Sequence, residues 1–107
     1  MKKLWDKLKI NAFKRKNSSL MSLTQTYFGQ DRDLFGETIE EVVQSYCDNG
    51  ENATRWLKSE ITEMLKTEDD SELITRMELL AENQFTPEPW GETWRSFLQR
   101  VLRTLPG

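Results

Sequence analysis

The chain has 107 residues, with 18 acidic and 15 basic side chains, one Cys and no His. This length predicts a single domain. The missing His excludes a Ser/His/Asp triad, a Cys/His dyad and an imidazole metal ligand. A single Cys excludes a disulfide framework and a thiolate zinc site. The enzyme classes that remain use carboxylate pairs, metals bound by oxygen atoms, or Lys and Tyr chemistry.

The net charge of -3 conceals a division along the chain. Residues 1–16 hold seven basic side chains and one acidic side chain, a net charge of +6, whereas residues 17–107 hold eight basic and 17 acidic side chains, a net charge of -9. An acidic body repels nucleic-acid phosphates and anionic lipid and attracts a basic partner. We therefore divide the chain into a basic N-terminal arm or first helix, residues 1–17, and an acidic helical domain, residues 18–107.

The N-terminal arm has the pattern of an amphipathic helix. Leu4, Trp5, Leu8 and Ala12 share one helical stripe with lysines around it. Such a helix suits a membrane surface or an RNA contact, but we favour packing of Leu4, Trp5 and Leu8 on the acidic body of the same chain. The arm lacks the apolar segment of a signal peptide, and the chain has no apolar run of about 18 residues, so no targeting signal or membrane span is predicted.

Two helices are predicted in the first half of the acidic domain. Asn17, Ser18 and Ser19 can cap a short helix that ends at Gly29. Thr38 and Glu41 have the spacing of a capping box at the start of the next helix, which ends before residues 48–50. The apolar positions of these helices are Leu20, Leu23 and Tyr27, followed by Ile39, Val42, Val43 and Tyr46.

Three more segments complete the prediction. Asn52 can cap a helix that reaches a turn at residues 67–70, a further helix begins at Asp70 or Ser71, and residues 84–91, with two prolines, form an extended connector that cannot be helical before the last helix. The apolar stripes are Ala53, Trp56, Leu57, Ile61, Met64 and Leu65, then Leu73, Ile74, Met77, Leu80 and Ala81, and finally Trp94, Phe97, Leu98, Val101, Leu102 and Leu105. We predict an all-α single-domain bundle of about five to six short helices.

Two acidic segments were tested as metal or catalytic sites. Asp31, Asp33 and Gly36 match the start of a calcium loop, but Phe35 and Val42 stand where such a loop needs oxygen ligands, so a capped turn is favoured. The acid run of residues 68–72 could share a proton or hold Mg²⁺, but it lies in a predicted exposed turn and helix start, which favours solvation. We predict no catalytic residue, no metal ligand and no cofactor.

Cysteine and tryptophan positions favour packing over chemistry. Cys47 has no basic neighbour in sequence that would activate its thiol, so a partly buried thiol is expected. Trp90 and Trp94 flank a helix start, where aromatic side chains are usually core anchors and less often stack on a ligand.

Two stretches carry a resemblance to a known family. Residues 23–41 (LTQTYFGQDRDLFGETIEE) and 90–105 (WGETWRSFLQRVLRTL), joined by two amphipathic helices, resemble the helical immunity proteins of bacterial contact-dependent growth inhibition systems. The resemblance covers about residues 20–105. The matching motif positions are Tyr27, Phe28, Gln30, Asp31, Glu37, Thr38, Glu40 and Glu41, and then Gly91, Thr93, Trp94, Phe97 and Leu98.

The resemblance implies a function without catalysis. It predicts a small cytoplasmic protein that binds and neutralises, in a 1:1 complex, the C-terminal toxin domain of a cognate large surface exoprotein. Such toxins are often nucleases, and a ribonuclease is expected here. The motif residues Tyr27, Phe28, Gln30, Gly91, Thr93, Trp94, Phe97 and Leu98 are expected to define the fold, whereas residues that contact the toxin differ from pair to pair and cannot be transferred.

Charge provides a separate hypothesis for the toxin-binding residues. A nuclease active site is basic because it binds phosphate, so an acidic protein can occupy it and be steered toward it. The candidate toxin-binding residues are Asp31, Asp33, Glu37, Glu40 and Glu41, together with Glu68, Asp69, Asp70 and Glu72.

Three other functions stay open at this point. The main alternative is a generic acidic helical adaptor or antitoxin that binds a basic protein partner. A carboxylate enzyme with Mg²⁺ would depend on Asp69 and Asp70. Nucleic-acid binding would have to use the basic arm; neither nucleic-acid binding nor stable membrane association is expected of the acidic body.

Overall fold

The computed structural model describes the backbone of residues 2–30 and 34–106, and the side chains of residues 7–29 and 34–106. In chain order the elements are α1 (Lys2–Lys16), α2 (Ser18–Ser22), the π-helix η1 (Leu23–Gln30), α3 (Ile39–Cys47), α4 (Glu51–Met64), α5 (Asp70–Ala81), the 3₁₀-helix η3 (Glu88–Trp90) and α6 (Trp94–Thr104). The described residues contain no strand. The predicted all-α fold is confirmed.

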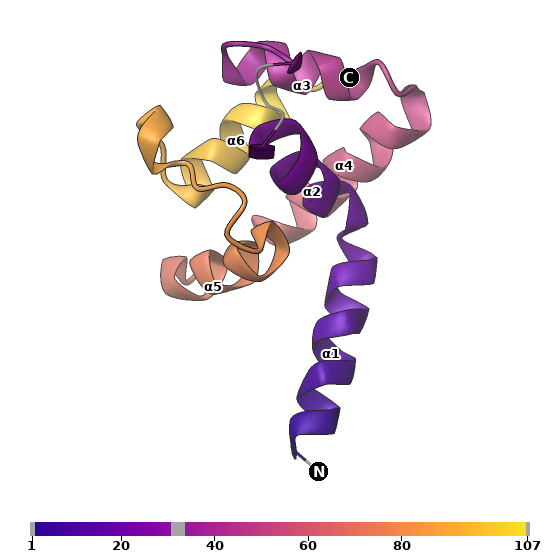
Figure 1. Cartoon of the computed structure of the whole chain (residues 1–107), viewed down its shortest axis with the longest axis vertical. Helices are drawn as coiled ribbons and strands as arrows, with labels where there is room; N and C mark the ends of the chain where they lie inside the picture. The colour runs from indigo at the N-terminus through magenta and orange to yellow at the C-terminus, as the bar shows by residue number, and fades with distance from the viewer. Residues whose placement is uncertain (1, 31–33, 107) are drawn as a thin grey trace.

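The bundle is arranged around α6, which contacts α3, α4 and α5. Figure 1 shows α3 and α5 at opposite ends of the bundle, with α6 between them. The α6 sequence favours this central place, because its apolar side chains recur at helical spacing along one face. The fully buried side chains of the core include Phe97 and Leu98 of α6, Leu57 and Ile61 of α4, Leu73, Met77 and Leu80 of α5, Ile39, Val42 and Val43 of α3, and Leu20 and Leu23.

The first helix projects away from this bundle (Figure 1). Leu8 is 53% exposed, so its predicted packing on the body is wrong; the side chains of Leu4 and Trp5 lie outside the described residues. The helix contacts the body near its C-terminal end, where Phe13 packs against the core and Lys14 pairs with Glu82 at 3.5 Å. Only the final turns of α1 therefore lie within reach of the bundle.

The second helix is capped by a distant carboxylate. Asn17 precedes α2 but makes no side-chain cap, because its amide donates to the Phe13 carbonyl instead. The backbone N–H groups of Ser19 and Leu20 donate to the Glu60 carboxylate of α4, at 3.3 and 2.9 Å. The chain then continues into η1, where a non-helical backbone at Gly29 ends the helical run.

The starts of α3 and α6 show how local sequence sets helix boundaries. The Thr38 hydroxyl accepts the Glu41 N–H at 3.1 Å, as the capping-box spacing predicts. The Glu41 carboxylate accepts the N–H of Glu37 rather than that of Thr38, so the box is only half formed. At α6, Thr93 and Ser96 cap each other's backbone N–H groups reciprocally.

Several details of α4 and α5 differ from the prediction. The N-cap of α4 is Gly50, and Asn52 lies inside the helix. Trp56 is 62% exposed, and Ile74 of α5 is 40% exposed, although the sequence pattern predicts both on buried apolar faces. Leu57 occupies the centre of the inward face of α4, and successive helical residues are about 100° apart, so Trp56 turns outward.

The connector before α6 is partly helical, which corrects the sequence prediction. Glu88–Trp90 form one 3₁₀ turn with Pro89 near its start, where a missing N–H costs no hydrogen bond. Gly91 ends the turn with φ of 77°, a left-handed conformation that glycine adopts without steric cost.

Candidate functional site

The first group of predicted toxin-binding acids surrounds the start of α3. Asp31 and Asp33 lie outside the described residues. Glu37, Glu40 and Glu41, which we call the α3 acidic cluster, are described; Glu37 and Glu41 are exposed. The side chain of Glu40 is 44% exposed, and its carboxylate accepts two hydrogen bonds from Arg100 of α6, at 2.5 and 2.9 Å. Glu40 therefore connects α3 to α6.

Arg100 also binds a second carboxylate. One of its terminal nitrogens donates to Glu92 at 3.0 Å. The hydrogen bond from Arg100 lowers the pKa of the Glu40 carboxyl, and hydrogen bonds from Ser96 and then Arg100 lower the pKa of Glu92. Both carboxylates thus remain ionised at neutral pH, and the guanidinium offsets part of their charge.

The second group of predicted acids lies at the turn between α4 and α5. We call Glu68, Asp69, Asp70 and Glu72 the α5 acidic cluster. Asp69 caps α5 by accepting the Ser71 N–H at 2.8 Å. Asp70 pairs with Arg95, and Glu72 pairs with Arg76, each at 2.6 Å. Glu68 is exposed, and its side chain forms no ion pair within the part of the chain that the structure describes.

Arg95 holds this turn in place. Its guanidinium donates to the carbonyl oxygens of Thr67 and Glu68, at 2.6 and 3.2 Å, in addition to Asp70. This role was not predicted from the sequence. The sequence held one indication of it. A basic residue in the first turn of a helix lies at the positive end of the helix dipole, which is unfavourable unless another contact compensates.

The fold does not merge the two acidic clusters into one site. Arg95 and Arg100 are five residues apart in α6, so their side chains leave the helix in directions that differ by about 140°. The clusters that they bind lie toward the α3 and α5 ends of the bundle (Figure 1). The molecule therefore presents two separate acidic surfaces.

The α5 acidic cluster borders a shallow hollow of about 560 Å³. Its lining includes Glu68, Asp69 and Glu72, together with Glu63, Lys66, Thr67 and Arg76. Within the described residues, no group of three or more Cys, Asp and Glu side chains is arranged to hold a metal ion. Asp69 and Asp70, which a magnesium enzyme would use, bind Ser71 and Arg95 respectively.

Tyr27 and Phe28, two motif residues of η1, pack against aromatic rings of neighbouring elements. The Tyr27 ring contacts Phe35 and Tyr46, with ring centroids 4.3 and 5.2 Å away, and its hydroxyl accepts a hydrogen bond from Asn49. Phe28 is 2% exposed and contacts the rings of Phe85, Trp90 and Phe97. The side chain of Gln30 is outside the described residues. Tyr27 and Phe28 thus join η1 to α3 and α6.

The closing motif lies at the start of α6. Gly91 and Thr93 terminate η3 and cap α6, while Trp94, Phe97 and Leu98 are buried. Trp90 packs against the core as well, and so does the half-buried Cys47. Core packing of these two residue types was expected from the sequence.

A comparison with protein families identifies the chain. The model of the CdiI immunity protein family matches residues 16–105. The chain belongs to this family. Membership confirms the resemblance found in the sequence. The matched residues span α2 to α6, whereas Lys2–Lys16 of α1 lie almost wholly before them. No curated protein and no solved structure matched the chain.

As a CdiI immunity protein, the chain acts in immunity against a toxin of a contact-dependent growth inhibition system. Membership in this family indicates an inhibitor that works by binding a cognate toxin rather than by catalysis. None of the described helices has the length and apolar character needed to cross a lipid bilayer.

Proposed function

We propose that this CdiI protein neutralises a nuclease toxin, with ribonuclease as the expected activity, by covering the basic substrate-binding surface of the toxin in a 1:1 complex in the cytoplasm. A nuclease must bind a polyanion, so its active site carries positive charge. The observation that supports the proposal is the acidic body, with a net charge of -9 over residues 17–107.

The exposed carboxylates of the two acidic clusters are the proposed contacts. Each cluster keeps a charge of -2 when its arginine partners are counted: three acids with Arg100 in one, four acids with Arg76 and Arg95 in the other. Glu37 and Glu68 are exposed members whose side chains have no ion-pair partner among the described residues. Their charge is therefore available to a partner, and they can be substituted without breaking an internal contact.

The test compares two double variants with the same change in net charge. The first reverses Glu37 and Glu68 to Lys, and the matched control reverses Asp48 and Glu78, which are exposed acids outside both clusters. The toxin domain encoded immediately upstream is used as a catalytically inactive variant, and its association with each double variant is measured by stopped flow at low and high salt. The cluster variant should associate about tenfold more slowly at low salt, because rim charges act mainly on the association rate.

Three results would contradict the proposal. Equal association rates for the two double variants would show that total charge, and not the clusters, steers binding. A toxin domain without nuclease activity would exclude the stated chemistry. Failure of the chain to rescue cells that express this toxin would favour the alternative of a general acidic adaptor or antitoxin.

The basic arm provides a separate check on nucleic-acid binding. Removal of residues 1–16 should leave any measured affinity for RNA unchanged, because the proposed function does not use such an affinity. A loss of RNA binding on removal would support the nucleic-acid interpretation instead.

A further inference from the structure

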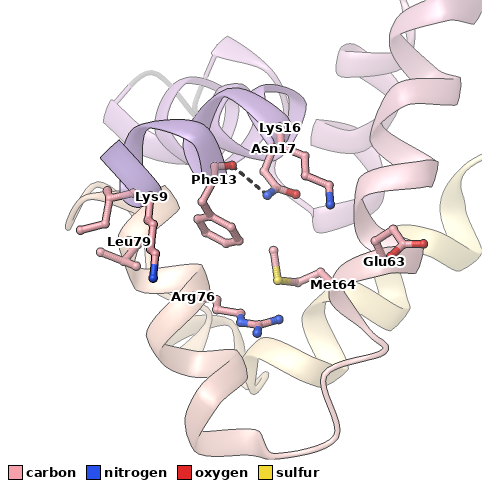
Figure 2. A pocket seen from close by; sticks show the side chains of 9 residues that line it. Lys9, Phe13, Lys16, Asn17, Glu63, Met64, Arg76 and Leu79 are labelled. Carbon is pink, nitrogen blue, oxygen red and sulfur yellow. Dashed lines mark hydrogen bonds between the residues drawn. The ribbon is translucent and has the colours of Figure 1, made fainter. Parts of the chain in front are cut away.

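An open groove of about 440 Å³ lies between α1, α4 and α5. Figure 2 shows the side chains that surround it, with the Phe13 ring and Met64 facing the hollow. Neither acidic cluster contributes to its lining. Part of its wall comes from Lys9, Ile10 and Phe13 of α1, which precede the residues matched by the family.

The floor of the groove is apolar and partly open to solvent. Ile10, Phe13, Met64 and Leu79 form it, and Leu79 is 36% exposed. An apolar hollow bordered by polar groups is the usual receptor for a side chain of a bound protein segment. Its volume is sufficient for one large apolar side chain with its flanking backbone.

The rim has the opposite charge to the rest of the body. Lys9, Lys16 and Arg76 border the groove, and Glu63 is the acid of its lining; the charge of Arg76 is offset by Glu72. Lys66 pairs with Glu63 at 2.8 Å, and its hydrogen bond lowers the pKa of that carboxyl. Lys9 and Lys16 form no ion pair within the described residues. The groove is therefore a locally cationic site on an acidic protein.

The α1 wall is fixed to the body at this point. The Phe13 carbonyl accepts a hydrogen bond from Asn17 at 2.9 Å, the Phe13 ring packs against the core, and Lys14 pairs with Glu82. Arg76 is oriented by hydrogen bonds to Thr67 and Glu72, at 2.7 and 2.6 Å. The groove thus exists before any partner arrives, which lowers the entropic cost of binding.

We propose that this groove binds an acidic segment of the cognate toxin domain, with one apolar side chain of that segment inserted between α1, α4 and α5. The inference deepens the proposed function and rests on it. Charge complementarity selects an acidic partner, and the apolar floor selects a protein segment over a phosphate backbone. A second contact of opposite sign to the acidic clusters would fix the orientation of the toxin and reject toxins that lack the acidic segment.

The first experiment is a matched pair of charge reversals on α1. Lys9→Glu changes a groove lysine, and Lys7→Glu makes the same change at an exposed lysine of the same helix that does not line the groove. The Kd for the inactive toxin domain encoded immediately upstream is measured by calorimetry. Lys9→Glu should raise the Kd about fivefold or more at low salt, with Lys7→Glu within about twofold of the wild type.

The second experiment is a matched pair of truncations on α5. Leu79→Ala removes an apolar side chain of the groove, and Ile74→Ala removes one of similar exposure, 40% against 36%, outside it. Leu79→Ala should raise the Kd about fivefold or more, and Ile74→Ala should leave it within about twofold. Circular dichroism of all four variants checks that each keeps the helical fold.

The outcomes separate this inference from the proposed function. If the two variants of either pair have equal Kd values while the wild type still binds the toxin domain, the groove is not a toxin contact and the proposed function stands. If light scattering shows that the groove variants change self-association and not toxin affinity, the occupant is a second copy and the inference is wrong. If the wild type does not bind the toxin domain, both fail.

Discussion

The Glu60 carboxylate connects two helices. It caps α2 from α4, and burial raises the pKa of its carboxyl despite the hydrogen bonds from Ser19 and Leu20. A raised folded-state pKa means that the folded chain holds this proton more tightly than the unfolded chain, so ionisation of Glu60 costs folding free energy as the pH rises above 4.5.

Glu60→Gln should therefore gain stability relative to the wild type as the pH increases from 4.5 towards neutral, because the amide carries no buried charge. Its one oxygen can accept from only one of the two α2 N–H groups, and this loss does not depend on pH. Urea unfolding of both proteins between pH 4 and pH 7 measures the difference. A difference that does not change with pH over this range would show that burial of the charge has no net cost.

Glu40 supplies a control of opposite sign. Arg100 lowers its pKa, so ionised Glu40 stabilises the fold above the ordinary value of 4.5, and this contribution is lost as the pH falls through the lowered pKa. Glu40→Gln should be less stable than the wild type near neutral pH. The two proteins should converge as the pH falls below 4.5, in the same urea experiment extended to pH 2.

Gly36 has no room for a side chain. A Cβ atom there would lie 2.5 Å from the Cβ of Glu41 and 3.1 Å from backbone atoms of α3. Gly36→Ala should reduce the free energy of unfolding by about 2–3 kcal/mol, because the start of α3 has to move. At Gly91 a Cβ meets nothing within 4 Å, so Gly91→Ala should cost only about 1 kcal/mol for its left-handed backbone. Equal losses in chemical denaturation would contradict the steric explanation.

At the scale of elements, sequence predicts helices well where their signals are local. Thr38 and Thr93 cap the helices that follow them, and apolar spacing identifies the buried faces of α3 and α6. The cap of α2 could not be found in this way, since Glu60 is 40 residues from Leu20 in the chain. The exposure of Trp56 also depends on which neighbouring helices cover α4.

In the candidate site too, the local features were predictable from the sequence and the long-range contacts were not. The sequence located both acidic segments, because acidity is a property of composition. It did not show that Arg95 and Arg100 bind these segments, since Arg100 is 60 residues from Glu40 and Arg95 is 25 residues from Asp70. The groove was also missed, because it arises only where α1, α4 and α5 meet.

Arg95 is expected to stabilise the α4–α5 turn as a unit. Arg95→Ala should lower the free energy of unfolding by about 1–2 kcal/mol, since the carbonyl oxygens of Thr67 and Glu68 lose a charged donor. Amide exchange in residues 65–70 should become faster. Arg103→Ala, an exposed arginine of the same helix, is the control and should leave both measurements nearly unchanged. Unaltered amide exchange in the Arg95→Ala variant would contradict the proposed role of this side chain.

The whole molecule combines a packed bundle with a helix that only partly touches it. An isolated helix of about 15 residues is marginally stable in water, so the part of α1 before Lys9, the first residue of the groove lining, has little to maintain it. Amide hydrogens in residues 6–8 should therefore exchange much faster than those of Val42 or Ile61, which lie in the core. Comparable protection in both regions would show that α1 is held by contacts beyond those at Phe13 and Lys14.

Removal of the basic arm tests the predicted division at residue 17. A fragment of residues 18–107 should still unfold cooperatively, because its core residues lie within α2 to α6. Its melting temperature should fall by a few degrees, since Phe13 no longer packs against the core. A fragment without a cooperative transition would show that the arm belongs to the folding unit.

The pairing of acids with the α6 arginines affects how the toxin specificity of an immunity protein can change. Glu40 and Asp70 join α6 to α3 and α5, so changes there alter the scaffold. Glu37 and Glu68 stand beside them at the surface without such contacts in the described residues. Substitutions can accumulate at these two positions at small thermodynamic cost, so the proposed recognition surface can diverge while the bundle beneath it stays the same.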